Sequence, residues 1–315
     1  MGYQRLQKAD IADTPFIRRK VKECGDVITV TELSRMPNTQ ATIIKLSGSE
    51  YLDVASGEIR EYEKHAETRI ESEQSARRTM AHIRDLVNCN VTRWNSLYCH
   101  WITFTYRDRT VKGVEGAARV SHDWDCFWKR FRRYCGRKGY KKPEYITVME
   151  PHGDGVYHLH VILIWAFKRP FIPNETMAQL WTQGFTKTQK LPHTNMGAYL
   201  SAYLADIEVD EYNGTIPYGY KVEEKTVGGQ KKRFIKGARL KFYPSGVNII
   251  RHSRGIAYPN EYDITVDEMN AMQGDMMPSY EYHARITDEE TGFELIMTRR
   301  IYVRNADSPP LARAA

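Results

Sequence analysis

The chain has 315 residues, a formal net charge of +7 and an isoelectric point near 9.0. This length allows one large domain or two smaller ones, and the share of apolar residues, 41%, is that of an ordinary soluble globular protein. No apolar run is long enough to span a membrane, and the N-terminus has no hydrophobic signal core, so we expect a cytoplasmic protein. The five cysteines form no CxxC pair, which argues against a disulfide framework or a zinc knuckle.

The N-terminal third of the sequence divides into two segments with different patterns. Residues 1–57 contain short apolar runs separated by Gly, Pro and Ser, and we expect an appendage that is either β-rich or partly disordered. Residues 58–88 predict one basic helix with a moderate apolar face. This helix either packs against a sheet or contacts a polyanion, and packing is the favoured interpretation.

The next segment predicts a strand followed by an amphipathic helix. Residues 101–106 alternate apolar side chains with Thr103 and Thr105, as a strand does. Over residues 121–134, aromatic side chains recur at helical spacing and predict a stripe that faces the core. That stripe consists of Trp124, Phe127, Trp128 and Phe131. Ser121 is a suitable cap for the start of this helix.

The remaining faces of the same helix, and the residues after it, are basic. No acidic residue occurs between positions 129 and 142, and a run of one sign favours contact with phosphate groups. The residues expected to make this contact are Lys129, Arg130, Arg132, Arg133, Arg137 and Lys138.

Two apolar strands, at 145–149 and 157–164, are separated by turn residues and predict a hairpin. Because side chains alternate along a strand, His158 and His160 point to the same face. Glu150 ends the first strand, so the hairpin can bring its carboxylate beside the two imidazoles. Two imidazoles and a carboxylate suit a divalent ion, and we expect Mg²⁺ or Mn²⁺. His152, in the turn, is a weaker ligand candidate.

The last half of the chain predicts further helices and strands. A helix is expected over 173–181, and another over 195–206, where Tyr199 and Tyr203 share one face because they are four residues apart. The pattern of residues 208–236 predicts a long loop or an exposed hairpin with a basic tip. Residues 238–258 are expected to return a final strand to the sheet. The segment 259–315 is interpreted as a C-terminal extension with a partly disordered tail. Hairpin strands with interposed helices indicate an α+β fold.

These motifs, in this order, resemble the HUH endonuclease superfamily, and more closely the two-tyrosine rolling-circle replication initiators of plasmids and single-stranded DNA phages. The 101–106 strand resembles the first motif of the family. Glu150 with His158 and His160 resembles its metal-binding motif, and Tyr199 with Tyr203 resembles its catalytic motif. Segments around 242–246 and 252–255 resemble a closing segment of such initiators. The resemblance implies an initiator domain over 58–258, with 208–236 as an insert and a central antiparallel sheet of about five strands.

The resemblance also implies an activity. The protein is expected to nick and rejoin single-stranded DNA at a replication origin through a 5′-phosphotyrosine intermediate, and so to start and end rolling-circle replication. A P-loop motif is missing from the sequence, so a host helicase is an expected partner. The resemblance also implies a host DNA polymerase as a partner. One position departs from the family, which usually has a lysine three residues after a catalytic tyrosine. Here Ala202 and Asp206 occupy those positions, and Lys187 or Lys190 is a possible substitute.

Three alternatives remain at this stage. The first is an origin-binding protein with weak or no catalytic activity, favoured by the missing lysines. The second is another HUH enzyme, although relaxases commonly place the tyrosine before the histidine motif and the transposases are usually shorter chains. The third is a metal-dependent hydrolase of small phosphates, for which the basic helix and the paired tyrosines have no obvious purpose.

Overall fold

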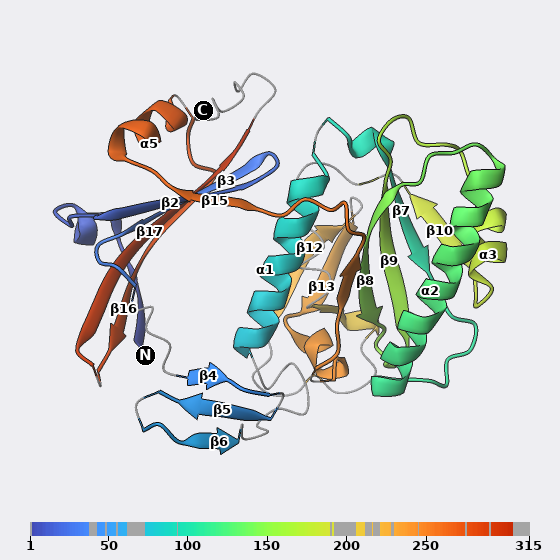
Figure 1. Ribbon diagram of the computed structural model, residues 1–315, viewed down its shortest axis with the longest axis horizontal. Helices are drawn as coiled ribbons and strands as arrows, with labels where there is room; N and C mark the ends of the chain where they lie inside the picture. Colours follow the sequence, from blue (N-terminus) through green and yellow to red (C-terminus); the bar gives the residue numbers. More distant parts are fainter. Residues whose placement is uncertain are drawn as a thin grey trace. The chain divides into compact units, whose positions relative to one another are not determined.

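A computed structural model describes fourteen parts of the chain. They are residues 2–37, 43–47, 49–54, 56–61, 73–92, 94–189, 191, 206–211, 216, 221–227, 230–244, 246–274, 276–289 and 291–304. The chain divides into two compact units, one built from Met1–His65 and Pro259–Ala315 and the other from Ala66–Tyr258 (Figure 1). Among the described helices, none has the length and apolar character needed to cross a membrane.

The first unit contains a six-stranded antiparallel sheet with the strand order β1-β16-β17-β3-β2-β15. Its strands are β1 (Gly2–Leu6), β2 (Arg18–Cys24), β3 (Val27–Leu33), β15 (Asn260–Asp263), β16 (Tyr280–Asp288) and β17 (Phe293–Val303). The sheet combines three strands from the N-terminal part of the chain with three from the C-terminal part, so neither part could form this sheet by itself. Helix α5 (Val266–Gln273) begins at a capping box formed by Thr265 and Glu268, and its Met269 joins a small core with Ile28 and Tyr302.

A second sheet of this unit corrects one prediction. Strands β4 (Ile43–Lys45), β5 (Glu50–Asp53) and β6 (Ile59–Glu61) pair antiparallel. The single helix predicted over 58–88 is therefore wrong at its start, because Ile59 pairs with Leu52 of β5. The described helix, α1 (Glu73–Asn90), begins well after that strand. Backbone pairing with β5 satisfies the hydrogen-bonding groups of 59–61 and outweighs their helical pattern.

The second unit is built around a five-stranded antiparallel sheet with the order β10-β7-β9-β8-β14. Its strands are β7 (Cys99–Phe104), β8 (Glu144–Pro151), β9 (Tyr157–Ile164), β10 (Thr186–Gln189) and β14 (Ile250–His252). Helix α1 lies on one side of the sheet, and α2 (Gly113–Arg137) and α3 (Asn174–Trp181) lie on the other (Figure 1). The predicted α+β class and the five-stranded antiparallel sheet are confirmed, and β14 is the expected final strand.

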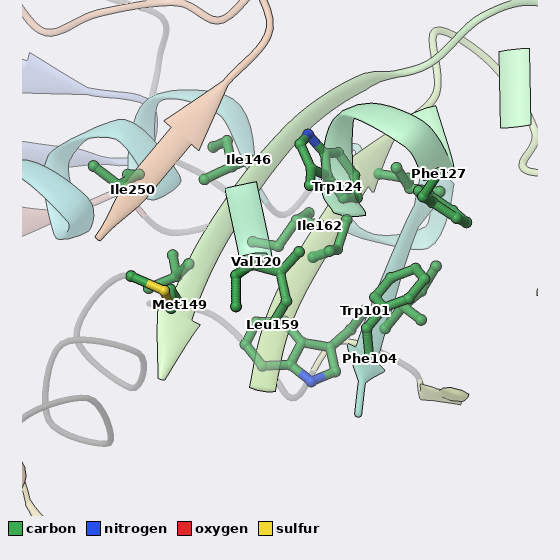
Figure 2. Packing of buried hydrophobic residues seen from close by; sticks show 14 of the residues in the cluster. Trp101, Phe104, Val120, Trp124, Phe127, Ile146, Met149, Leu159, Ile162 and Ile250 are labelled. Carbon is green, nitrogen blue, oxygen red and sulfur yellow. The ribbon is translucent and has the colours of Figure 1, made fainter. Parts of the chain in front are cut away.

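The aromatic stripe of α2 forms the centre of the core of this unit. Trp124, Phe127 and Phe131 are buried, and the ring of Phe127 lies 4.7 Å from that of Phe104 on β7. Figure 2 shows Trp124 and Phe127 among the side chains of the sheet. Burying an aromatic side chain of this kind stabilises the fold by roughly 1.5–3 kcal/mol. The stripe is therefore a packing surface, as the spacing predicted.

The start of this helix differs from the prediction. Helix α2 begins at Gly113, eight residues before the predicted cap, and Ser121 lies inside it with its hydroxyl donating to the Ala117 carbonyl at 3.1 Å. A serine inside a helix bonds back to the preceding turn in this way, so its presence alone does not mark a helix start.

Helix α3 confirms the prediction over 173–181 and leads tightly into β10. The indole nitrogen of Trp181 donates to the Thr105 carbonyl at 2.7 Å, which fixes the end of the helix against β7. Gly184 lies in the connection, and a Cβ atom at this position would come within 2.3 Å of the same carbonyl oxygen. Only glycine allows the backbone to pass so close.

A small three-stranded sheet follows the segment of the predicted tyrosines. It consists of β11 (Ile207–Glu208), β12 (Val222–Val227) and β13 (Gln230–Ile235) in the order β11-β13-β12. Of the two expectations for 208–236, the hairpin is the one found. Short 3-10 turns, η3 (Val209–Glu211) and η4 (Ala238–Phe242), follow β11 and β13, and Ile207, Ile235 and Ala238 form their common core.

Candidate metal centre

The β8–β9 hairpin sets the relative positions of the three predicted metal ligands. Its turn is closed by hydrogen bonds from the His152 amide to Val156 and from the Gly155 amide to His152. Gly155 has a φ of +84°, which favours glycine at this position. The resulting register places Glu150 directly opposite His158. Because directly paired residues of an antiparallel sheet project to the same face, the carboxylate and both imidazoles meet.

The three side chains form a compact buried cluster. The His158 Nε2 atom lies 3.0 Å from Glu150 Oε2 and 2.9 Å from His160 Nε2, and His160 Nε2 also contacts Glu150 Oε2. One ligand atom from each residue falls within 4.8 Å of the others. Glu150 is fully buried, and the two histidines are almost so. The structure thus brings together the two imidazoles and the acid that the sequence analysis singled out.

The outer nitrogen of each imidazole has its own partner. His158 Nδ1 lies 2.7 Å from His152 Nε2, and His160 Nδ1 lies 3.3 Å from the Thr103 hydroxyl. The indole ring of Trp101 stacks on His160 at 5.3 Å. When both Nδ1 atoms carry the protons, the lone pairs of both Nε2 atoms face the cluster, and such outer contacts commonly orient metal-binding histidines. His152 is thus placed as a partner of His158. Thr105, the second threonine of the 101–106 segment, instead donates to the Phe185 carbonyl and supports the fold.

The pKa values of Glu150 and His158 are shifted in the directions that favour metal binding. Burial lowers the pKa of His158, and it lowers the pKa of His152 to about 4. Burial alone would raise the pKa of Glu150, but the Arg239 guanidinium and the two imidazoles together hold it well below its usual value. At neutral pH the site therefore offers a neutral His158 imidazole and an ionised Glu150 carboxylate, the forms that metal binding requires.

The donor set fits a divalent metal ion. Two nitrogen donors and one carboxylate oxygen converge from one face of the hairpin, and this mixed set of donors suits a divalent ion. The group could bind a metal ion, and its chemistry is compatible with more than one divalent metal.

The predicted tyrosines, Tyr199 and Tyr203, lie outside the described residues, as do Lys190 and Ala202. The described chain resumes at Asp206. Its carboxylate pairs with Lys236 at 3.1 Å and accepts a hydrogen bond from the Gly237 amide at 2.9 Å.

Lys187 lies on the cluster face of the sheet. It pairs across β10 and β7 with Thr103, which in turn pairs with His160 across β7 and β9. All three residues therefore project to one face, and Lys187 is exposed.

The predicted phosphate-binding residues of α2 separate into two groups. Arg130 is half-buried, and its guanidinium donates to the carbonyls of Leu180 and Trp181 at 2.7 and 3.2 Å, so it caps the end of α3. The others are exposed: Lys129, Arg132, Arg133, Arg137 and Lys138. Arg137 and Lys138 also line an open groove of about 530 Å³ together with Tyr134 and Phe171.

One central residue of the site was missed by sequence reasoning. Arg239, on η4, is buried and forms an ion pair with Glu150 Oε1 at 2.7 Å. It lies 89 residues after Glu150, in a basic stretch whose composition predicts exposure to solvent. No local pattern distinguishes it from the other basic residues of this stretch, so only the tertiary fold reveals its position.

The comparisons with known proteins agree with this site in one respect. A family model described as replication-associated protein ORF2/G2P matches residues 99–208, a stretch that runs from the start of β7 to the end of β11 and includes the whole metal cluster. The match supports a family of replication initiators. Neither the curated proteins nor the solved structures give a significant match.

Proposed function

We propose that the protein is a metal-dependent endonuclease and strand transferase that nicks and rejoins single-stranded DNA at a replication origin, and thereby starts and ends rolling-circle replication. The observation that carries this proposal is the buried cluster of Glu150, His158 and His160, which lies within the stretch that matches a replication-associated family. Such initiators bind DNA and often cleave it.

In this proposal Glu150, His158 and His160 hold Mg²⁺ or Mn²⁺. A bound ion supplies Lewis acidity that withdraws charge from the oxygens of the scissile phosphate. The protein holds the ligand atoms in place through the contacts of Thr103 and His152 to the two imidazoles. Because these contacts leave both Nε2 atoms facing Glu150, the ligands need no rearrangement before binding.

Tyr199 and Tyr203 are the proposed nucleophiles. The phenol loses its proton to solvent and its oxygen forms a bond to phosphorus, while the bond from phosphorus to the 3′ oxygen breaks. The departing oxygen takes up a proton to become a 3′ hydroxyl. The 5′ phosphate stays attached to the tyrosine, so the phosphodiester energy is retained for a later joining step. With two tyrosines, one can open the origin and the other can attack after a full circuit.

A phenol has a pKa near 10, so the attacking oxygen needs positive charge nearby. The family lysine is replaced by Asp206, which pairs with Lys236. Lys187 is our candidate for this cation, because it is exposed on the same sheet face as His160 and one strand beyond Thr103.

For the DNA contact we propose the exposed basic face of α2 and the groove at its C-terminal end. Lys129, Arg132 and Arg133 offer phosphate contacts along the helix. In the groove, Arg137 and Lys138 lie beside the aromatic rings of Tyr134 and Phe171. Cations combined with exposed aromatic rings suit a single strand, whose bases can stack. Arg130 is excluded from this surface because it caps α3.

The experiment is a search for a covalent adduct. Single-stranded oligonucleotides tiled across the replicon that carries the gene, labelled at their 3′ ends, are incubated with the protein and Mn²⁺ and resolved on a denaturing gel. We expect a labelled protein band that disappears with EDTA and in the Tyr199→Phe/Tyr203→Phe double variant. Tyr280→Phe, a change of an exposed tyrosine in the other unit, is the matched control and should keep the band. An adduct that survives the double substitution would refute the assignment.

A second candidate is an origin-binding protein that has lost catalysis, and the acidic residue at position 206 favours it. The same gel separates the two functions when it is combined with a binding assay. Affinity for single-stranded DNA that falls steeply with salt, without any adduct, would support the non-catalytic protein.

A further inference from the structure

Arg239 is the most completely buried charged group next to the proposed metal centre. It is 1% exposed, and each of its three nitrogens has a partner. Nη1 lies 2.7 Å from Glu150 Oε1 and donates to the Pro151 carbonyl at 2.6 Å, while Nε donates to the Asp206 carbonyl at 3.0 Å. Nη2 lies 3.5 Å from Glu211. A buried guanidinium with this many partners has one fixed orientation.

The two oxygens of Glu150 have different partners. Oε1 faces Arg239, whereas Oε2 faces the Nε2 atoms of both His158 and His160. The guanidinium thereby selects one rotation of the carboxylate, with its second oxygen directed into the cluster. If Arg239 were absent, the carboxylate could turn, and its buried charge would have to be compensated by the histidines alone.

Arg239 also connects two parts of the chain. The loop from β13 turns at Gly237, which has a φ of +72° and whose amide binds the Asp206 carboxylate. From this turn, Arg239 reaches the Asp206 carbonyl with one nitrogen and β8 with another. Asp206 is the first described residue after the segment that contains Tyr199 and Tyr203. A single side chain thus joins Asp206 to the strand of the metal ligand.

We infer that Arg239 is a positioning residue that orients the Glu150 carboxylate for metal binding and fixes Asp206, three residues after Tyr203 in the sequence, against β8. This inference rests on the proposed function, because it assigns Arg239 a role in the same metal centre. A purely structural ion pair would stabilise the fold without changing the metal affinity of the folded protein. The two roles therefore predict different results for affinity.

The test measures Mn²⁺ affinity by calorimetry and by electron paramagnetic resonance on the full chain, without DNA. Arg239→Met should weaken Mn²⁺ binding by about 10- to 100-fold, the usual range for residues that orient metal ligands. Arg239→Lys should also weaken it, because one ammonium group cannot span Glu150 and two carbonyls at once. The matched control is Arg130→Met, which removes a half-buried arginine that binds two carbonyls elsewhere in the same unit and should leave Mn²⁺ affinity unchanged.

Each outcome decides the inference. Mn²⁺ affinity within twofold of wild type in a folded Arg239 variant would overturn the positioning role while the proposed function stands. If Arg239→Met does not fold, as judged by circular dichroism, Arg239→Lys decides the question by the same criterion. Absence of Mn²⁺ binding by the wild-type protein would overturn both the inference and the proposed metal centre.

Discussion

The ion pair between Arg239 and Glu150 allows a prediction about folding stability that is independent of any metal. Arg239→Met leaves the Glu150 carboxylate buried without its guanidinium partner. Removal of one partner of a buried ion pair lowers the free energy of unfolding by about 3–5 kcal/mol. In a Glu150→Gln background the same substitution leaves no buried charge behind. There it should cost only the lost bonds to the Pro151 and Asp206 carbonyls, about 1–3 kcal/mol.

The assay is urea unfolding followed by tryptophan fluorescence, in EDTA at pH 7. All six tryptophans of the chain lie within Ala66–Tyr258, so the signal reports on the unit that contains the site. The four proteins of the double-mutant cycle give a coupling energy, which we expect to be about 2 kcal/mol. Equal costs of Arg239→Met in both backgrounds would show that the ion pair is not formed and would refute the reasoning.

Three further predictions concern the rest of this unit. Trp124→Ala should lower the free energy of unfolding by about 3–5 kcal/mol, measured in the same assay, because the indole is buried at the centre of the core; a loss below 1 kcal/mol would contradict that placement. Burial lowers the pKa of His100 to about 4, so the unfolded chain binds a proton between pH 4 and 6.5 that the folded chain does not. Stability should therefore rise with pH across this window, by no more than about 3 kcal/mol from this group. His100→Leu should remove that part of the slope, and an unchanged slope would refute the assignment. Thr103→Val should weaken Mn²⁺ binding about tenfold through the loss of the contact to His160, whereas Thr105→Val should not; equal effects of the two would argue against a specific role for Thr103.

Much of the site follows from two local rules. Alternation along a strand places His158 and His160 on one face, and a tight turn returns the next strand in a register that opposes Glu150 to His158. Both rules act over a few residues, so the sequence alone was sufficient to group these three side chains. The aromatic stripe of α2 was predictable for the same reason, because its spacing is that of a single helix face.

What the sequence could not reveal depends on contacts between distant segments. Arg239 reaches Glu150 only because the hairpin of β12 and β13 leads η4 back to β8. The six-stranded sheet of the first unit also depends on contacts between distant segments, because β17, near the end of the chain, pairs with β3 as well as with β16. Residues 59–61 were assigned to a helix although pairing with β5 makes them a strand. Local patterns contain no information about such partners.

The central claim is that Glu150, His158 and His160 bind a divalent metal ion. Its most direct test is anomalous X-ray scattering at the manganese edge from crystals grown with Mn²⁺. We predict a peak within bonding distance of Glu150 Oε2 and of the Nε2 atoms of both histidines. A difference map without a peak at these three atoms, while Mn²⁺ is bound elsewhere in the protein, would contradict the claim.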